Sequence, residues 1–297
     1  MKKISLFPYM VILTTIGCTA QQKPAFKINK NNNTLLWQVS GKDLKKPSFL
    51  FGTFHLLCKD DINFSPQLKT AIQYADTIYM ELDLDDPSTM MGGLLYLTMK
   101  DGKSLKDFYT PEEYTKIEKY FNDSLQMPMI MFQKVKPYFL VAMLYPKMMK
   151  CKTFSGIEEE VMKLAKQNNK EIKGLETVKF QSSIFDSIPY ELQAKELLKN
   201  IDSLDKYKNE FDTLMQAYKN QQLNAMEELM NRSEFGMEKY ENILVNYRNA
   251  NWVKQLKVIM KNESVFIAVG AGHLLGEKGL IKLLKAEGYV VEPVENK

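Results

Sequence analysis

Residues 264–294 read SVFIAVGAGHLLGEKGLIKLLKAEGYVVEPV, and the order of apolar and polar letters in them is that of an α/β protein. The apolar run Ser264–Val269 predicts a buried strand. Gly276–Ala286 predicts a helix, and Tyr289–Val294 predicts a second strand. A strand, a helix and a further strand in this order are typical of sheets that contain parallel pairs.

The same alternation runs through the preceding residues. Short apolar runs predict strands at Ser48–Thr53, Thr77–Leu82 and Glu171–Leu175. Helix starts are expected at three capping patterns, namely Ser65-Pro66, Thr110-Pro111-Glu112-Glu113 and Ser155-Gly156-Ile157-Glu158. Residues 190–261 are charged, nearly free of Gly and Pro, and spaced as amphipathic helices. We therefore expect an α/β fold with a mixed, largely parallel sheet surrounded by helices, and a helical subdomain at 190–261 before the last strand–helix–strand unit.

The composition is that of an ordinary globular protein. Of the 297 residues, 45% are hydrophobic and 26% are charged, and 40 basic against 36 acidic residues leave a formal charge of +4. Arg232 and Arg248 are the only arginines in the sequence. So small a basic excess, with so few guanidinium groups, argues against a nucleic-acid partner.

The N-terminus is predicted to be an export signal. Met1–Ala20 has two lysines, then an apolar stretch and then small residues, and it is too short for a convincing membrane span. Thr15-Ile16-Gly17-Cys18 resembles a bacterial lipobox, in which Cys18 would be lipidated; simple cleavage after Ala20 is the alternative. Residues 21–33 are polar, as expected of a tether to a domain at 34–297. We therefore expect an exported protein of the bacterial cell envelope, periplasmic or at the cell surface, held by a lipid anchor or otherwise secreted.

Export also bears on the two remaining cysteines. Cys58 and Cys151 form an even pair in an oxidising compartment, so a disulfide between them is one interpretation. A free thiol or a metal ligand at Cys58 is the other, although no spacing in the sequence supports it.

The chain has two histidines, and both occupy the same setting. His55 closes Gly52-Thr53-Phe54-His55 and His273 closes Gly270-Ala271-Gly272-His273, in each case directly after an apolar strand. Ligands bind at the carboxyl ends of the strands in open α/β sheets, and a neutral imidazole there can bind a metal or transfer a proton. A single such histidine is more simply a hydrogen-bonded structural residue, but the repeated setting favours a functional pair.

Carboxylates follow two further predicted strands. Glu81 stands at the end of one strand, and Glu176 follows the next. A solvated strand-end charge is the simple interpretation of each, and Asp83 is an alternative to Glu81 because it faces the same side. Two histidines with one or two carboxylates suit a divalent metal ion such as Mn, Co, Fe or Zn, which activates water. The remaining glutamate would then act as a general base.

Four strings along the chain resemble the TraB/GumN family. They are FLFGTFHLL (49–57), YMELD (79–83), GIEEEVMKLAKQNNKEIKGLET (156–177) and the C-terminal stretch from Val265. The resemblance implies kinship with the Tiki metalloproteases and, more remotely, with the erythromycin-esterase and ChaN-like group. It also implies an α/β sheet formed from two related halves. The Tiki-like pattern makes His55, Glu81 and His273 metal-site candidates, and it places Glu176 at the family's G-L-E-T position.

The leading hypothesis is a metal-dependent hydrolase, in the first place a peptidase, at the cell envelope. His55, His273 and Glu81 would hold the ion, and Glu176 would assist as a base or as a further ligand. A peptide or protein is the expected substrate, and the membrane is reached through the N-terminal lipid anchor. One alternative is a surface lipoprotein that binds a ligand such as haem, which the ChaN-like relatives suggest. The other is a scaffold with an inactive site.

Overall fold

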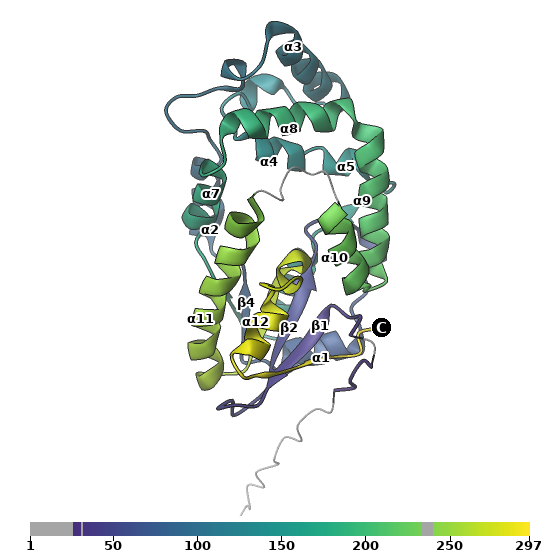
Figure 1. Cartoon of the computed structure of the whole chain (residues 1–297), viewed down its shortest axis with the longest axis vertical. Helices are drawn as coiled ribbons and strands as arrows, with labels where there is room; N and C mark the ends of the chain where they lie inside the picture. Colours follow the sequence, from purple (N-terminus) through teal and green to yellow (C-terminus); the bar gives the residue numbers. More distant parts are fainter. Residues whose placement is uncertain (1–25, 31, 233–239) are drawn as a thin grey trace, which may run out of the picture.

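A computed structural model describes residues 26–30, 32–232 and 240–297 of the chain. Its main feature is a six-stranded sheet with the order β6-β4-β7-β2-β1-β8, beside a two-stranded sheet of β3 and β5 (Figure 1). The strands are β1 (Leu36–Ser40), β2 (Ser48–Thr53), β3 (Leu57–Cys58), β4 (Thr77–Met80), β5 (Phe154–Ser155), β6 (Glu171–Gly174), β7 (Val265–Gly270) and β8 (Val290–Pro293).

The directions of the strands confirm the predicted mixed, largely parallel sheet. β2 pairs in parallel with β7, β7 with β4, and β4 with β6. β1 pairs antiparallel with both β2 and β8, so β8 runs in the same direction as β7. β2 and β7 carry the two G-x-x-H motifs at their ends. They are neighbours at the centre of the sheet because their apolar residues are covered on both faces.

Several helices begin at a residue whose side chain caps the first turn or at a proline, because the first backbone N–H groups of a helix have no partner within it. Ser65 accepts a hydrogen bond from the Leu68 N–H at the start of α1, and Thr110 and Glu113 form the predicted capping box of α3. The helices are α1 (Pro66–Tyr74), α2 (Pro87–Tyr96), α3 (Pro111–Lys119), α4 (Pro137–Ala142), α5 (Tyr145–Met148), α6 (Ile157–Gln167), α7 (Val178–Asp186), α8 (Tyr190–Asp202), α9 (Leu204–Lys219), α10 (Leu223–Arg232), α11 (Tyr247–Asn262) and α12 (Leu280–Ala286).

Two helix starts differ from the sequence prediction. The predicted capping box at Ser155 is wrong. The N-cap of α6 is Gly156, which has no side chain to accept a hydrogen bond. The carboxylate of Glu158, the other predicted member of the box, instead accepts a hydrogen bond from the hydroxyl of Thr53 on β2. The C-terminal helix begins at Leu280 and not at Gly276, whose φ of 76° lies in the left-handed region. Strands β1, β3 and β5 and helices α2, α4, α5 and α7 were not predicted.

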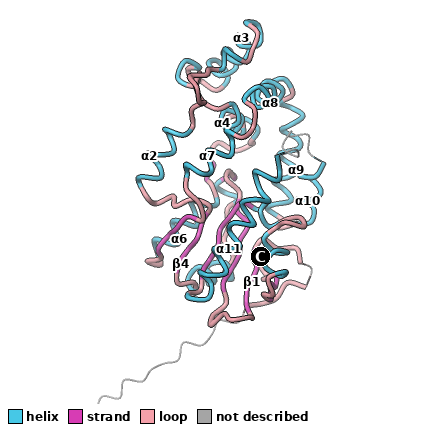
Figure 2. The backbone as a smooth tube through the Cα atoms, turned by 60° about the vertical axis from the view of Figure 1, so that its left-hand side comes forward, coloured by secondary structure: helices cyan, strands magenta, loops and turns pink. Residues whose placement is uncertain are grey.

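The helices form two groups around the sheet (Figure 1). α11 and α12 contact each other on one face, and α1 contacts α6 on the other. Helices α2 to α5 and α7 to α10 lie beyond one end of the strands, as the turned view in Figure 2 also shows. Buried apolar side chains of the sheet and of residues 190–261 belong to one continuous core, which includes Tyr207 and Trp252. The helical segment therefore shares its core with the sheet.

A buried ion pair ties α4 to α7 in the helical part. Lys136, directly before α4, is 2% exposed at its side chain, and its Nζ lies 2.9 Å from Asp186 Oδ1. It also donates to the backbone carbonyl and the hydroxyl of Ser182, both at 3.0 Å. The phenolic O–H of Tyr190 donates to the same Asp186 oxygen at 2.6 Å.

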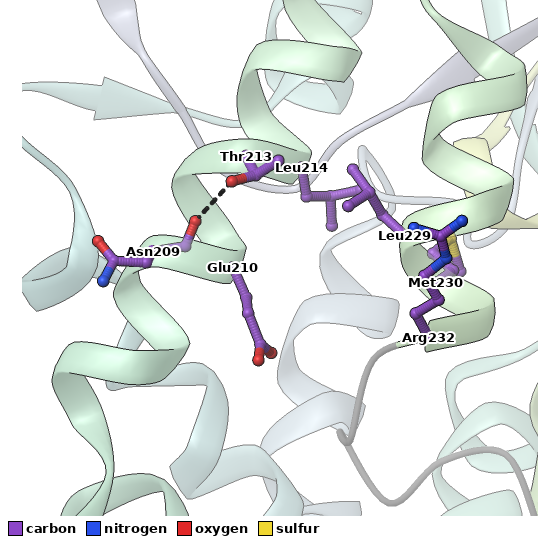
Figure 3. Close-up of a pocket in the computed structure, with 7 residues that line it drawn as sticks. All are labelled: Asn209, Glu210, Thr213, Leu214, Leu229, Met230 and Arg232. Atoms are coloured by element: carbon purple, nitrogen blue, oxygen red, sulfur yellow. Dashed lines mark hydrogen bonds between the residues drawn. The ribbon is translucent and has the colours of Figure 1, made fainter.

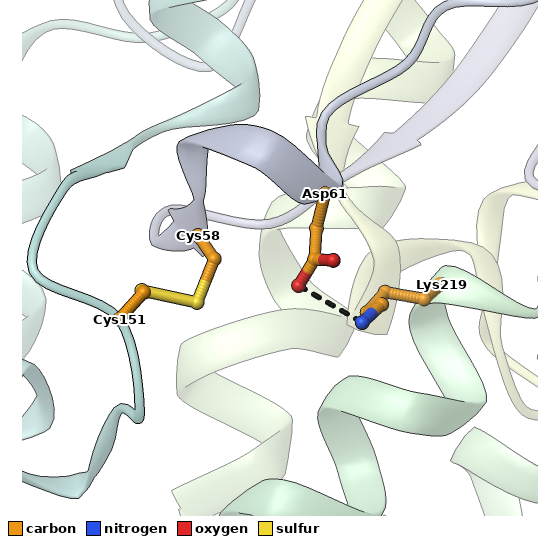
Figure 4. Close-up of a disulfide and its surroundings, with 4 residues drawn as sticks. All are labelled: Cys58, Asp61, Cys151 and Lys219. Atoms are coloured by element: carbon orange, nitrogen blue, oxygen red, sulfur yellow. Dashed lines mark ion pairs between the residues drawn. A yellow bond between two sulfur atoms is a disulfide. The ribbon is translucent and has the colours of Figure 1, made fainter.

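A disulfide joins the small sheet to the helical part (Figure 4). Cys58, at the end of β3, is bonded to Cys151, with Cα atoms 5.7 Å apart and a sequence separation of 93. Close by, an ion pair of 2.9 Å between Asp61 and Lys219 holds the loop after β3 to the end of α9. Both links fix the segment that directly follows His55.

The predicted signal at Met1–Ala20, with Cys18, lies outside the described residues. Part of the predicted tether at 21–33 is described, and it contacts the domain: the ring of Phe26 lies 4.7 Å from that of Phe49, and Ile28 pairs with Val294. Within residues 26–30, 32–232 and 240–297, no helix combines the length and the apolar character that crossing a membrane requires.

Candidate functional site

A buried arginine gathers the polar side chains that follow three neighbouring strands. Arg248, on α11, places Nη2 2.5 Å from Glu81 Oε2 and 2.6 Å from Glu176 Oε1. Its Nε donates to both oxygens of Glu176, at 3.0 and 3.2 Å, and its Nη1 lies 3.0 Å from Nε2 of His273. Trp252, one turn further along α11, packs its ring against the guanidinium and donates its indole N–H to Glu176. One cation therefore contacts three of the residues predicted from the sequence.

The sheet brings these residues together because they directly follow adjacent parallel strands. Glu81 directly follows β4, and Glu176 follows β6 with one residue between them. The Glu176 N–H donates to the Glu81 carbonyl at 3.0 Å. On the other side of β4, the backbone N–H of Gly270 at the end of β7 donates to Glu81 Oε1 at 2.9 Å. A Cβ atom at Gly270 would lie 3.2 Å from that oxygen, so glycine permits this close approach.

His273 is held as a neutral hydrogen-bond acceptor. Asn249 donates its amide N–H to the backbone carbonyls of His273 and Lys278, which leaves its Oδ1 to accept from His273 Nδ1 at 2.7 Å. Because Arg248 can only donate, Nε2 must be the unprotonated nitrogen. Burial lowers the pKa of His273 to about 3. The imidazole is therefore neutral at ordinary pH, with its lone pair on Nε2.

The two carboxylates differ in how readily they bind a proton. Burial raises the pKa of Glu81, but His273, Arg248 and His55 around it outweigh burial and lower it to about 2. For Glu176 the effect of burial prevails over the hydrogen bond from Arg248, so its pKa lies above its ordinary value. Glu81 is thus the firmly ionised partner of Arg248, and Glu176 is the one that accepts a proton more readily.

His55 has a different partner and stands at the surface. Its Nδ1 lies 2.8 Å from Oε1 of Glu158 on α6, and the hydroxyl of Thr53 donates to the same oxygen at 2.6 Å. The side chain of His55 is 79% exposed, whereas that of Glu158 is 14% exposed. The hydrogen bond to Glu158 raises the pKa of His55 to about 9. The carboxylate fixes the orientation of the imidazole, as in other carboxylate–imidazole pairs.

Both histidines belong to one edge of the sheet. Thr53 and Gly270 are register partners at the ends of β2 and β7. A Cβ atom at Gly52 would lie only 3.1 Å from Cα of Ala271, so the first G-x-x-H motif packs directly on the second. The charge of His55 is also near enough to contribute to the lowered pKa of Glu81. The strand ends predicted to form a site therefore do lie side by side.

Comparison with known proteins shows the family of the chain. The model of the TraB/PrgY/gumN family matches residues 35–293. The chain belongs to the TraB/PrgY/gumN family. This confirms the resemblance drawn from the four sequence strings, and the match includes both G-x-x-H motifs, Glu81, Glu176 and Arg248.

Relatives of this TraB/PrgY/gumN chain carry the name metalloprotease. It is 21% identical to Metalloprotease TIKI1 of Danio rerio, over 88% of this chain and 63% of the relative. It is 24% identical to the Metalloprotease TIKI homolog of Nematostella vectensis, over 90% and 68%, and 21% identical to that of Amphimedon queenslandica, over 98% and 68%. The chain thus spans less than two thirds of the Danio rerio relative. No solved structure matches the chain.

The metal-binding set predicted from the sequence does not form in this arrangement. Glu81 Oε1 and His273 Nε2 lie 3.8 Å apart, but the guanidinium of Arg248 contacts both side chains, and His55 turns to Glu158 instead. Among residues 26–30, 32–232 and 240–297, no three His, Cys, Asp or Glu side chains are grouped to hold a metal ion. The donors as placed fit an internal cation and not a metal ion. The assignment of His55, Glu81 and His273 as metal ligands stays a prediction.

Sequence reasoning missed three members of this TraB/PrgY/gumN site. Glu158 was interpreted as a helix cap, and Asn249 gave no signal. Arg248 gave a signal, because only two of the 40 basic residues are arginines. An arginine in a chain that otherwise uses lysine suggests a position where a planar, forked hydrogen-bond donor is needed. The sequence could not say which carboxylates that fork would meet.

Proposed function

We propose that this chain is a hydrolase of the Tiki-like type whose first substrate class is the peptide bond. The observation that carries the proposal is one sheet edge at which an oriented, exposed imidazole lies beside a buried arginine with two carboxylates. The relatives named metalloproteases support peptides as substrates, at identities of 21 and 24%.

His55 is the residue best placed to move a proton. Its Nδ1 is engaged by Glu158, which leaves Nε2 as the nitrogen that can face water or a substrate. In hydrolysis a base takes a proton from water as the water oxygen bonds to the carbonyl carbon. The C–N bond then breaks as the leaving nitrogen receives a proton. Because a pKa of about 9 keeps His55 protonated near pH 7, in this proposal His55 donates the proton that the leaving nitrogen receives, and Glu176 accepts the proton from water. Glu158 is the positioning residue that fixes the ring of His55.

Arg248 and its partners supply the fixed charges. A buried guanidinium is suited to a carbonyl oxygen that gains negative charge during the reaction, because it needs little reorganisation. Glu81 and Glu176 hold it in place from two sides. Glu176, whose pKa is raised, is the carboxylate of the pair that can take up a proton during the reaction.

A divalent metal ion enters the proposal through the names of the relatives. Arg248 provides the cation in the arrangement described, so no step is assigned to an ion. Mn, Co, Fe and Zn are the ions to test.

The place of action is also part of the proposal. The sequence of Met1–Ala20 supports export, with lipidation of Cys18 or cleavage after Ala20, and a site in the cell envelope. Mass spectrometry of the N-terminal peptide of the mature protein distinguishes a lipidated Cys18 from a chain that begins at Gln21.

The test is digestion of a peptide library by the full chain, with chelator and with each of the four metal ions. We expect cleavage in at least one condition, and a loss of about 10²-fold or more in His55→Ala, the range for removal of a group that transfers a proton in the transition state. Glu158→Gln should lower the rate, whereas Glu159→Gln, its neighbour on the outside of the same helix, should not. No cleavage under any condition, or full activity of His55→Ala, would refute the proposal.

A further inference from the structure

A cavity of about 270 Å³ lies between α9 and α10 (Figure 3). Leu214 on α9 and Leu229 on α10 face each other across it, and Met230 adds a further apolar wall. Glu210 of α9 directs its carboxylate into the same space. The volume is below that of pockets for whole drug-sized ligands, so it suits one side chain of a larger molecule.

One carboxylate oxygen of Glu210 stands out among the atoms that line this cavity. This oxygen, Oε2, is shielded from solvent and has no hydrogen-bond partner among the described residues. A shielded carboxylate oxygen is costly unless a donor or a cation reaches it. Because the surrounding walls are apolar, a fitting ligand group would have an aliphatic stem and end in a cation. Lysine and arginine side chains have this form.

The second charged group of the cavity does not favour an anion there. Arg232, the last residue of α10, lies 3.5 Å from Glu228, and its side chain is 79% exposed. Solvent and this partner screen its charge. A side chain that ended in a carboxylate would instead meet Glu210 and be repelled.

The cavity adjoins the candidate site through Met230. A Cβ atom at Gly272 would lie 3.0 Å from Cε of Met230, so this wall of the cavity touches the second G-x-x-H motif one residue before His273. A peptide held with one side chain in the cavity would therefore pass close to the strand ends. This continuity is the observation that connects the cavity with the candidate site.

We propose that the cavity between α9 and α10 is a substrate subsite that takes a long, positively charged side chain, with lysine as its simplest occupant, and that Glu210 determines this specificity. The subsite rests on the proposed hydrolase function for its role in turnover. Its binding chemistry stands by itself and can be measured without turnover.

The binding test uses the full chain with Nα-acetyl-lysine amide and Nα-acetyl-norleucine amide, which differ only in the terminal ammonium group. We expect the lysine probe to bind at least tenfold more tightly by NMR titration, with shifts at the Met230 methyl group. Glu210→Gln should remove this difference, whereas Glu227→Gln, the same change on α10 but outside the cavity lining, should keep it. Equal binding of the two probes, or a lysine preference that survives Glu210→Gln, would overturn the proposal.

The turnover test separates this proposal from the proposed function. If peptides are cleaved, wild type should prefer lysine or arginine at one fixed position from the cut bond, and Glu210→Lys should replace that preference with aspartate or glutamate. Cleavage without any such preference would overturn the subsite and leave the hydrolase standing. Glu210-dependent lysine binding without cleavage of any peptide would refute the hydrolase and keep the cation-binding cavity.

Discussion

Replacement of Arg248 by methionine tests whether the guanidinium holds the site together. The change keeps much of the apolar stem and removes the charge from between Glu81 and Glu176, whose side chains are 13% and 4% exposed. Breaking a buried pair by removing one partner costs about 3–5 kcal/mol, because the other charge stays buried. Two carboxylates lose their partner here, although Glu176 can be protonated, so we expect a loss within that range.

The assay is urea unfolding of the full chain followed by circular dichroism, with the loss read from the midpoint at constant slope. Arg232→Met is the matched control: it removes the other arginine, which is 79% exposed, and should change the free energy of unfolding by less than about 0.5 kcal/mol. The double variant Arg248→Met/Glu176→Gln should recover part of the loss, because one uncompensated charge is gone. A loss for Arg248→Met as small as that of Arg232→Met, or a double variant no more stable than the single one, would refute the reasoning.

Three further predictions concern other parts of the molecule. The double substitution of Cys58 and Cys151 by serine should lower the free energy of unfolding by about 2–4 kcal/mol, since the bond closes a long loop; a melting temperature unchanged by the substitution and by reductant would contradict this. Burial raises the pKa of Asp186, but hydrogen bonds from Tyr190 and Lys136 outweigh burial and lower it. The ionised carboxylate therefore stabilises the folded chain above about pH 4, and this contribution is lost as the pH falls through the pKa of the folded state. Asp186→Asn should therefore be destabilised at pH 6 and approach wild type near pH 2 in unfolding experiments, and a difference that does not depend on pH would count against the ion pair. Glu158→Gln should bring the pKa of His55 down from about 9 toward 6.5, measured by NMR titration of the imidazole protons, and an unchanged titration would exclude the pairing.

The sheet was predictable because its strands are short, apolar and bounded by clear turn signals. β2 and β7 read as buried runs, and two parallel strands of one sheet must bring their carboxyl ends to the same edge. β1 was missed because LWQVS has only 5 residues and begins with two apolar ones, so few positions show the alternation of a strand. Helices α4 and α5 were missed because they are short and separated by a few residues, which leaves little helical period to recognise.

The site was only partly predictable, for a different reason. His55, Glu81, His273 and Glu176 were found because strand ends can be read from the sequence. Arg248 comes from α11, the last helix of the segment 190–261, and nothing in the period of that helix shows that its guanidinium reaches two strand-end carboxylates. Whether a side chain from a neighbouring layer reaches the site depends on how the layers pack. Local sequence patterns carry no information about that packing.

The two G-x-x-H motifs look alike in sequence, but their surroundings assign the histidines opposite electrostatic characters. His273 faces a guanidinium, is buried and is kept neutral, so its Nε2 is an acceptor. His55 faces a buried carboxylate, is exposed and binds a proton more firmly than a free imidazole. A proton carrier must exchange with water or substrate, which suits His55, whereas a residue that fixes the position of Arg248 must not gain a charge, which suits His273. The repeated motif therefore marks one shared edge of the sheet, and the residues contributed by α6 and α11 determine what each imidazole does there.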